Sequence, residues 1–443
     1  MQKKLISLAL ATAFVAPGVV IAQSDGVTIN GNVNVEFYSV KIDQTPGQGG
    51  SPANGANDFR QEAIGDPTFF SRWAINIKED LGGGLAAIGK IEFAFSTGAG
   101  VNEVAREQWV GLTSKDWGTV HFGSVFAPFR IFAGGAAVDR FIGTSLHLRG
   151  SGGAQYAPAN GFGTGGFIDH AIYYTSPVWS GFSFAAVVAP SDATQADATL
   201  ANTNQRNGNT GGRGNGVDFQ VAGKYNIGKV GDVFAGYSRD SASDNQRAQG
   251  LINGKVADDE TVWRIGANLK FGDFGVYGQY DEIDSALNTF NLASLPTASG
   301  NGGAGCAGGA AAGSGADAGS TTQQCNSSLN VNGDGNIWSL GVSYALGKTL
   351  LVLQGGKTTA DAVGTALERT ATNVTVGAIY NLSKRTRFHA GYQRVNVEGA
   401  RLVNQIGLPT PAVFPANSPG VGGTALAEQP DRSVFSVGMR HSF

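Results

Sequence analysis

The chain has 443 residues, of which 67 are glycine, 15% are charged and only two are cysteine, and its formal net charge is −3. So small a charge does not favour a nucleic acid or an acidic surface as the partner. After the amino-terminal segment, no stretch approaches the roughly eighteen consecutive apolar residues of a transmembrane helix. A chain of this length often folds as two or three domains, but no linker separates blocks of different composition, so one domain is expected.

The first residues have the pattern of a secretory signal peptide. Lys3 and Lys4 precede an apolar stretch, residues 5–16, that is too short to span a bilayer. Small and β-branched residues before Gln23 offer a cleavage site. We expect residues 1–22 to be removed on export, with a retained membrane anchor as the alternative.

Residues 26–38 predict the first β-strand. Val27 and Ile29 begin an alternation of apolar residues with polar ones, which is the period of a strand with one apolar and one polar face. The last strand, residues 431–443, alternates in the same way and ends on Phe443. An open sheet edge leaves backbone N–H and C=O groups unpaired. We therefore expect the last strand to pair with the first and to close the sheet into a barrel.

Between these two strands the chain repeats one unit, about ten alternating residues followed by turn residues, which is typical of a transmembrane β-barrel. The connections alternate between short ones, such as residues 80–84, and long ones, such as residues 39–67. Short periplasmic turns and long external loops are the expected asymmetry of outer-membrane barrels. The predicted strands are residues 26–38, 68–79, 84–97, 105–114, 118–124, 168–177, 181–190, 216–226, 232–241, 259–271, 273–283, 335–346, 348–358, 370–382, 384–397 and 431–443.

Four stretches resemble the Gram-negative general porins, in particular those of β-proteobacterial type. They are SRWAINIKEDLGGGLAAIGKIEF, REQWVGLTSKDWGTVHFG, IDHAIYYTSPVWSGFSF and the terminal VGMRHSF. The resemblance implies an all-β fold, a 16-stranded antiparallel transmembrane β-barrel of the outer membrane formed by residues 23–443, with the third external loop folded inward. It also implies a water-filled channel for passive diffusion of small hydrophilic solutes and ions.

The same resemblance implies the partners of the chain. It predicts a homotrimer in contact with outer-membrane lipid and lipopolysaccharide, inserted by the barrel-assembly machinery, which would recognise the terminal Phe443.

Charges that project into the lumen would control such a channel. The resemblance assigns Arg72 and Arg106 to the inward wall and makes residues 124–166 the inward-folded loop, although this chain has Ser124 where the family has an arginine. For each loop arginine the alternative is a solvated surface charge. We expect a weak preference for anions. The constriction candidates are Arg72, Lys90, Arg106, His121, Arg130, Asp139, Arg140 and Arg149.

The remaining motifs point away from catalysis. Cys306 and Cys325 lie in one glycine-rich stretch, and an even pair in an exported chain predicts a disulfide, with two free thiols as the alternative. Residues 330–335 imitate the start of a calcium loop, but Gly341 occupies the place of the bidentate glutamate. The chain contains neither G-x-S-x-G nor H-E-x-x-H. We therefore predict no enzymatic activity, no cofactor and no metal.

Three alternatives stay open. The first is a substrate-selective outer-membrane channel for an anion, a sugar or an organic acid. The others are an outer-membrane barrel enzyme and a soluble β-sandwich lectin or adhesin.

Overall fold

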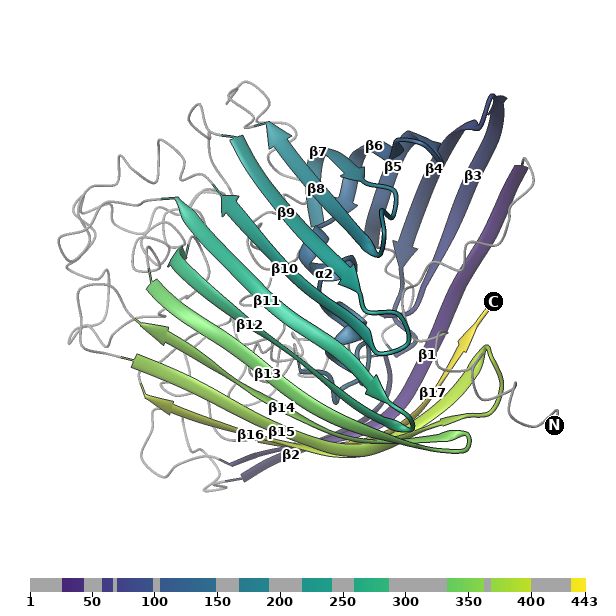
Figure 1. The fold of residues 1–443 in the computed structure, drawn as a ribbon. Helices are drawn as coiled ribbons and strands as arrows, with labels where there is room; N and C mark the ends of the chain where they lie inside the picture. Colours follow the sequence, from purple (N-terminus) through teal and green to yellow (C-terminus); the bar gives the residue numbers. More distant parts are fainter. Residues whose placement is uncertain are drawn as a thin grey trace, which may run out of the picture.

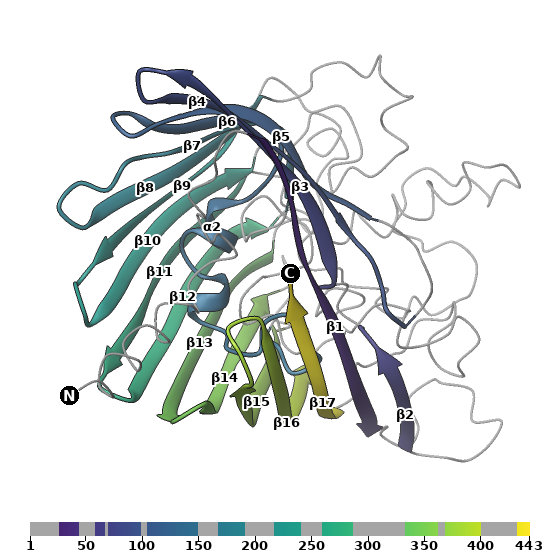
Figure 2. The ribbon, with the colours of Figure 1, turned by 90° about the vertical axis from the view of Figure 1, so that its right-hand side faces the viewer.

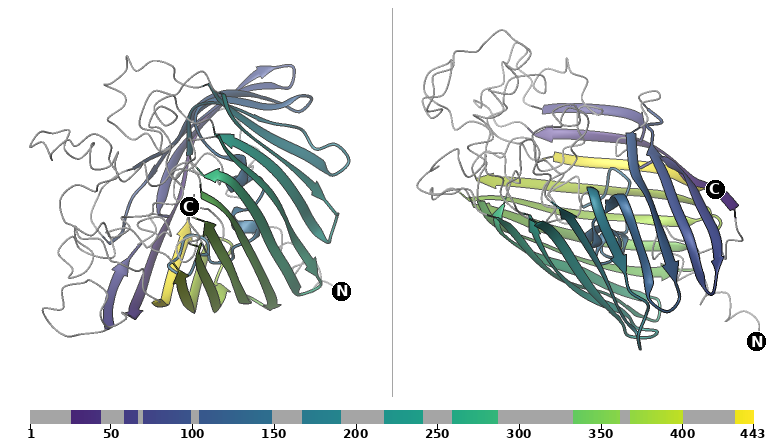
Figure 3. Two further views of the ribbon diagram at one scale, coloured as in Figure 1. Left: turned by 90° about the vertical axis from the view of Figure 1, so that its left-hand side faces the viewer. Right: turned by 90° about the horizontal axis from the view of Figure 1, so that it is seen from above.

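The computed structural model describes residues 26–43, 58–66, 70–98, 104–148, 167–190, 217–240, 259–286, 333–361, 368–399 and 432–443. These residues form one antiparallel sheet of seventeen strands that closes on itself into a barrel (Figure 1, Figure 3). The strands are β1 (Gly26–Asp43), β2 (Asp58–Gly65), β3 (Arg72–Gly82), β4 (Leu85–Ala94), β5 (Val104–Ser114), β6 (Gly118–Phe126), β7 (Phe167–Thr175), β8 (Phe182–Pro190), β9 (Val217–Asn226), β10 (Gly231–Asp240), β11 (Glu260–Phe271), β12 (Phe274–Ala286), β13 (Gly333–Leu346), β14 (Thr349–Asp361), β15 (Glu368–Asn381), β16 (Thr386–Gly399) and β17 (Arg432–Ser442).

The first and last strands close the barrel, as the alternation at the two ends of the chain predicts. β17 pairs with β1 in an antiparallel register that runs from Asn32 opposite Ser442 to Ile42 opposite Arg432. Beyond that ladder, the backbone N–H of Phe443 donates to the carbonyl of Gly31 at 3.0 Å, and the N–H of Gly31 donates back at 3.1 Å. The expected closure is therefore confirmed.

The second strand of the barrel is interrupted. β2 pairs with residues 36–43 of β1 and β3 pairs with residues 26–32, so the two segments occupy one position in the sheet and the barrel has sixteen strand positions. The prediction that residues 39–67 form only a loop is wrong, because β1 continues to Asp43 and β2 pairs with that extension. At the break, Asp66 accepts a hydrogen bond from the Ser71 N–H at 2.5 Å.

The polarity of the two faces of the sheet is the reverse of that in a soluble protein: the outer face is apolar and the inner face is polar. On β17, Phe435, Val437 and Met439 are exposed on the outside, whereas Ser436 and Arg440 are buried on the inside. Apolar outward side chains and polar inward ones are the arrangement that a lipid bilayer requires of a barrel. The alternation read from the sequence is thus present in the structure, with its apolar face turned to lipid.

The described connections between strands are short at one end of the barrel (Figure 1). In the β3–β4 turn, Gly82, Gly83 and Gly84 have φ angles of 82°, 61° and 82°, a left-handed region that glycine adopts without steric cost. Seven aromatic residues near this end are exposed, as an interfacial girdle requires. They are Trp117, Trp179, Tyr225, Phe271, Phe274, Tyr380 and Phe443.

Two short helices interrupt the connection between β6 and β7. The α-helix α2 (Pro128–Ile131) and the 3₁₀-helix η1 (Gly135–Ala137) lie within the ring of strands (Figure 2). No helix in the described parts of the chain is long and apolar enough to cross a membrane. Residues 127–148, called the inner segment below, position the candidate site.

Candidate functional site

The first part of the inner segment is attached to the wall by Arg264 of β11. Its buried guanidinium donates to both carboxylate oxygens of Asp281 at 2.6 and 2.7 Å. The same guanidinium donates to the carbonyls of Phe129 and Ala133 at 2.6 and 3.0 Å. On the neighbouring wall, Gln220 accepts from the Phe129 N–H at 2.7 Å. The buried ion pair of the wall therefore also fixes the helix α2.

The middle of the inner segment is attached through Asp139 and Arg140. The Asp139 carboxylate is buried and accepts hydrogen bonds from the Gln354 amide at 2.7 Å and from two backbone N–H groups of the segment itself. Burial raises the pKa of Asp139 to about 6, because it disfavours the charged form. Arg140 donates to Asn268 at 2.6 Å and lies over the Tyr277 ring at 4.1 Å. Both side chains therefore bind the segment to the wall.

The end of the inner segment crosses β16, β17 and β1. Glu36 of β1 accepts from the Ser145 N–H at 3.0 and 3.1 Å, and Ser436 and His389 also contact this carboxylate. Arg440 donates to the carbonyls of Ile142 and Gly143 at 3.0 and 2.9 Å. Gln393 donates to the carbonyl of Leu146 at 3.1 Å. These contacts hold the inner segment inside the barrel, where it follows the inner wall from β9 to β1.

Four arginines, called the basic row below, lie on the inner wall. Arg387 of β16 lies directly opposite Arg440 of β17. On β1, Arg440 pairs with Asn34, and Arg72 of β3 pairs with Asn32, two residues away. Arg440 interacts electrostatically with Arg387 and Arg72, and Arg72 interacts with Arg106 of β5. Asp66 and Glu36 interact electrostatically with Arg440, and Asp139 with Arg387, but among the described residues none of these carboxylates forms an ion pair with them. The row is therefore a band of fixed positive charge facing the lumen.

Carboxylates neutralise the basic charge mainly at the β4–β5 end of the row. Glu92 accepts from Arg106 at 2.5 Å and lies 2.9 Å from the Lys90 ammonium, whereas its distance to the Arg72 Nε is 4.0 Å. Lys90 also forms an ion pair with Glu107. Lys90 and Arg106 are thus largely paired, and Arg72 much less so.

The ring of Phe70 lies between two guanidinium groups of the basic row. The guanidinium carbon of Arg72 is 4.5 Å from the ring centroid, and that of Arg440 is 4.2 Å away. A Cβ added to Gly143 would lie 2.3 Å from the ring, so the inner segment approaches Phe70 closely. The break between β2 and β3, the inner segment and the basic row therefore meet at this residue.

The other described candidates lie near the Arg106 end of the basic row, where Arg106 and Arg130 lie over the same Phe126 ring and His121 interacts with Glu107 and Lys90. His121 faces inward but is stacked between Trp109 and Tyr173, with ring centroids 4.3 and 4.8 Å away. Arg130, in the last turn of α2, lies over the Phe126 ring at 4.4 Å. Arg149, residues 1–22 and the pair Cys306 and Cys325 lie outside the described residues, so their predicted roles stay predictions.

Arg387 and Arg440 belong to the site but are absent from the candidates that the sequence predicts. Both lie on predicted strands, and Arg440 alternates with the outward residues of the last strand, so its inward direction was readable. Strand parity does not show which inward residues from distant parts of the chain share one height in the barrel. Within the described residues, no three His, Cys, Asp or Glu side chains come together as a metal site would require.

Residues 7–400 match the family model of the Gram-negative porins. An outer membrane porin protein of Bordetella pertussis is 31% identical over 124 residues, which are 26% of this chain and 29% of that protein, so the match spans less than a third of that relative's length. The fold is similar to that of an anion-selective porin from Comamonas acidovorans, with a TM-score of 0.60, 18% identity and coverage of 95% of this chain and 100% of that one.

It is also similar to Salmonella typhi OmpF in complex with daunomycin, with a TM-score of 0.58, 11% identity and coverage of 95% of this chain and 98% of that one. At these identities, likeness to a structure shows the fold alone. The family match covers most of the chain, and the closed antiparallel barrel agrees with it. The chain therefore belongs to the Gram-negative porin family and is a protein of the outer membrane.

Proposed function

We propose that this protein forms a water-filled channel through which small hydrophilic solutes and ions diffuse passively, with a weak preference for anions. The observation that carries the proposal is the basic row on the inner wall, which contacts the inner segment at Arg440. A channel of this kind needs no catalytic group, and we propose no enzymatic activity.

The preference follows from the position of the charges. Fixed positive charge beside a narrow, partly desolvated aperture raises the local concentration of anions, and salt weakens the effect by screening. The chain as a whole is acidic, with a formal net charge of −3. Charges farther than a Debye length, about 10 Å at 0.1 M salt, contribute little at the aperture. The nearby arginines therefore dominate the selectivity.

The side chains of the site divide into two roles. The positive potential that attracts anions comes mainly from Arg72, Arg387 and Arg440. A smaller contribution comes from Arg106, Lys90 and Arg130, whose carboxylate and aromatic neighbours partly neutralise or cover them. Asp139 and Arg140 determine where the inner segment lies, and thus how wide the aperture is, and Arg440 also contributes to this through its bonds to the Ile142 and Gly143 carbonyls.

The assembly that we propose is a homotrimer in contact with lipid and lipopolysaccharide. Insertion by the barrel-assembly machinery would follow removal of residues 1–22, leaving residues 23–443 as the barrel. The exposed apolar outer face supports placement in lipid. Size-exclusion chromatography with light scattering in detergent measures the number of chains directly.

The reversal potential across a salt gradient in a planar bilayer tests the selectivity. We expect the parent protein to prefer anions at low salt and to lose that preference as salt rises. Arg72→Ala with Arg440→Gln should reduce the preference, while Arg385→Gln, an exposed arginine at a short turn, should leave it unchanged. A clear cation preference in the parent that the double substitution does not alter would refute the role of the basic row.

A further inference from the structure

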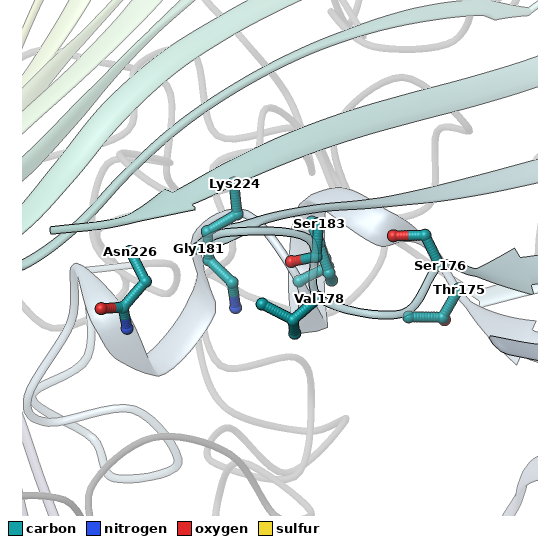
Figure 4. A pocket seen from close by; sticks show the side chains of 8 residues that line it. Thr175, Ser176, Val178, Gly181, Ser183, Lys224 and Asn226 are labelled. Atoms are coloured by element: carbon teal, nitrogen blue, oxygen red, sulfur yellow. The ribbon is translucent and has the colours of Figure 1, made fainter. Parts of the chain in front are cut away.

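A hollow of about 500 Å³ lies at the short-turn end of the barrel, between the inner segment and the ends of β7, β8 and β9. Figure 4 shows side chains from these elements around it, with Lys224 and Asn226 on β9 and Ser183 on β8. Phe132 of the inner segment also lines the hollow. Small-molecule sites commonly occupy about 300–1,000 Å³, so the size fits a small solute.

Lys224 gives the hollow a positive charge. Its ammonium lies 4.6 Å from the centroid of the Phe132 ring and, within the described part of the chain, makes no hydrogen bond or ion pair. The acidic group that interacts with it is Asp232, whose carboxylate is hydrogen-bonded by Asn268 and also interacts with Arg140. The three N–H donors of the ammonium are therefore available to an anion from the lumen.

The rest of the lining combines apolar surface with four polar side chains, those of Thr175, Ser176, Ser183 and Asn226. Phe132 and Val178 are apolar, and the Val178 side chain is 69% exposed. Gly181 has a φ of 90°, and a Cβ added there would lie 2.9 Å from the Asn226 carbonyl oxygen. The Ser183 hydroxyl and the Asn226 amide can each donate a hydrogen bond. A cation, neutral donors and an aromatic ring together suit an amphiphilic anion better than a simple halide.

We propose that this hollow is a binding station for small aromatic monocarboxylates that pass through the channel. The carboxylate lies on the Lys224 ammonium, with Ser183 and Asn226 as further donors, and the apolar ring lies against Phe132 and Val178. The station rests on the proposed channel function, since its ligand arrives through the lumen, but it is separate from the basic row.

Block of the chloride current by benzoate and by acetate tests the station, with each anion added to either side of a planar bilayer at constant ionic strength. Acetate has the same charge without the ring. We expect benzoate to block at lower concentration than acetate. Lys224→Gln should raise the half-blocking concentration of benzoate roughly fivefold, as expected for loss of an ion pair in a partly solvated site. Phe132→Leu should abolish the difference between the two anions.

Lys348→Gln is the matched control, because Lys348 is another lysine at a short turn, whose ammonium donates to the Leu382 carbonyl at 3.4 Å. It should leave both half-blocking concentrations unchanged. Equal block by the two anions in the parent, or an unchanged benzoate block in Lys224→Gln channels of normal chloride conductance, overturns the station and leaves the channel intact. A parent that conducts no chloride overturns both proposals.

Discussion

Replacing Arg264 by leucine tests whether the wall determines the position of the inner segment. The buried guanidinium makes hydrogen bonds to both oxygens of Asp281 and to the carbonyls of Phe129 and Ala133. Arg264→Leu removes these four bonds and leaves the Asp281 carboxylate buried, with Gln279 donating at 3.1 Å. Removing one partner of a buried ion pair costs about 3–5 kcal/mol.

Most of that loss should fall on the inner segment, because the strand ladders do not depend on this side chain. At the lower estimate of about 3 kcal/mol, local opening of α2 becomes more than a hundredfold more frequent. Amide hydrogen exchange in detergent measures it at Phe132 and Ala133, whose N–H groups donate to the Pro128 carbonyl at 2.9 and 3.0 Å. We expect these amides to exchange about a hundredfold faster while the amides of β11 keep their protection.

Two further variants separate the contributions. Adding Asp281→Leu to Arg264→Leu removes the unpaired charge but not the two unpaired carbonyls, so exchange should become intermediate. The control is Arg239→Leu, which breaks the exposed pair with Asp259 and should cost no more than about 1 kcal/mol, away from the inner segment. Exchange of the Phe132 and Ala133 amides within twofold of the parent in Arg264→Leu would refute the reasoning.

Three other predictions concern single side chains. Because the pKa of Asp139 is raised from 3.8 to about 6, its ionised form destabilises the folded segment, and this loss shrinks as the pH falls from about 6 toward 3.8. The protection factor of the Leu148 amide, which donates to Asp139 at 3.0 Å, should therefore rise from pH 7 to 5, and Asp139→Asn should flatten the response. Phe70→Leu loses two cation–π contacts of about 0.5–1 kcal/mol each and should lower the urea midpoint of unfolding, whereas Phe70→Tyr should not. Deleting Phe443 removes its two hydrogen bonds to Gly31 and should reduce the amount of folded barrel in the outer membrane, and a normal yield would contradict its role in assembly.

The local alternation of apolar and polar residues was sufficient to predict nearly every strand of this barrel. The predicted strand at residues 181–190 is observed at Phe182–Pro190, and that at 259–271 is observed at Glu260–Phe271. Side chains on an extended chain point to alternate faces, so a bilayer outside and water inside impose a period of two on each strand separately. Each strand could therefore be recognised without knowledge of its neighbours.

The interrupted second strand could not be recognised in this way. Residues 58–65 are short and include charged side chains, and their strand conformation depends on pairing with residues 36–43 of β1. That pairing exists because β1 extends beyond Tyr38, where the sequence alternation predicts its end. A strand that owes its conformation to a partner has no local signal of comparable strength.

In the candidate site, too, some features follow from local alternation and others depend on contacts between distant residues. The alternation of the strand predicts the inward direction of Arg72, and the resemblance predicts its place on the wall. Arg440 and Arg72 are far apart in the chain, and they lie near each other because the barrel closes with β17 and β3 both paired to β1. Likewise, the roles of Asp139 and Arg140 in attaching the inner segment depend on tertiary contacts. These are the hydrogen bonds to Gln354 and Asn268 of the wall. Strand direction is set by the sterics of a few neighbouring residues, whereas the meeting of distant side chains depends on the register of all the strands between them.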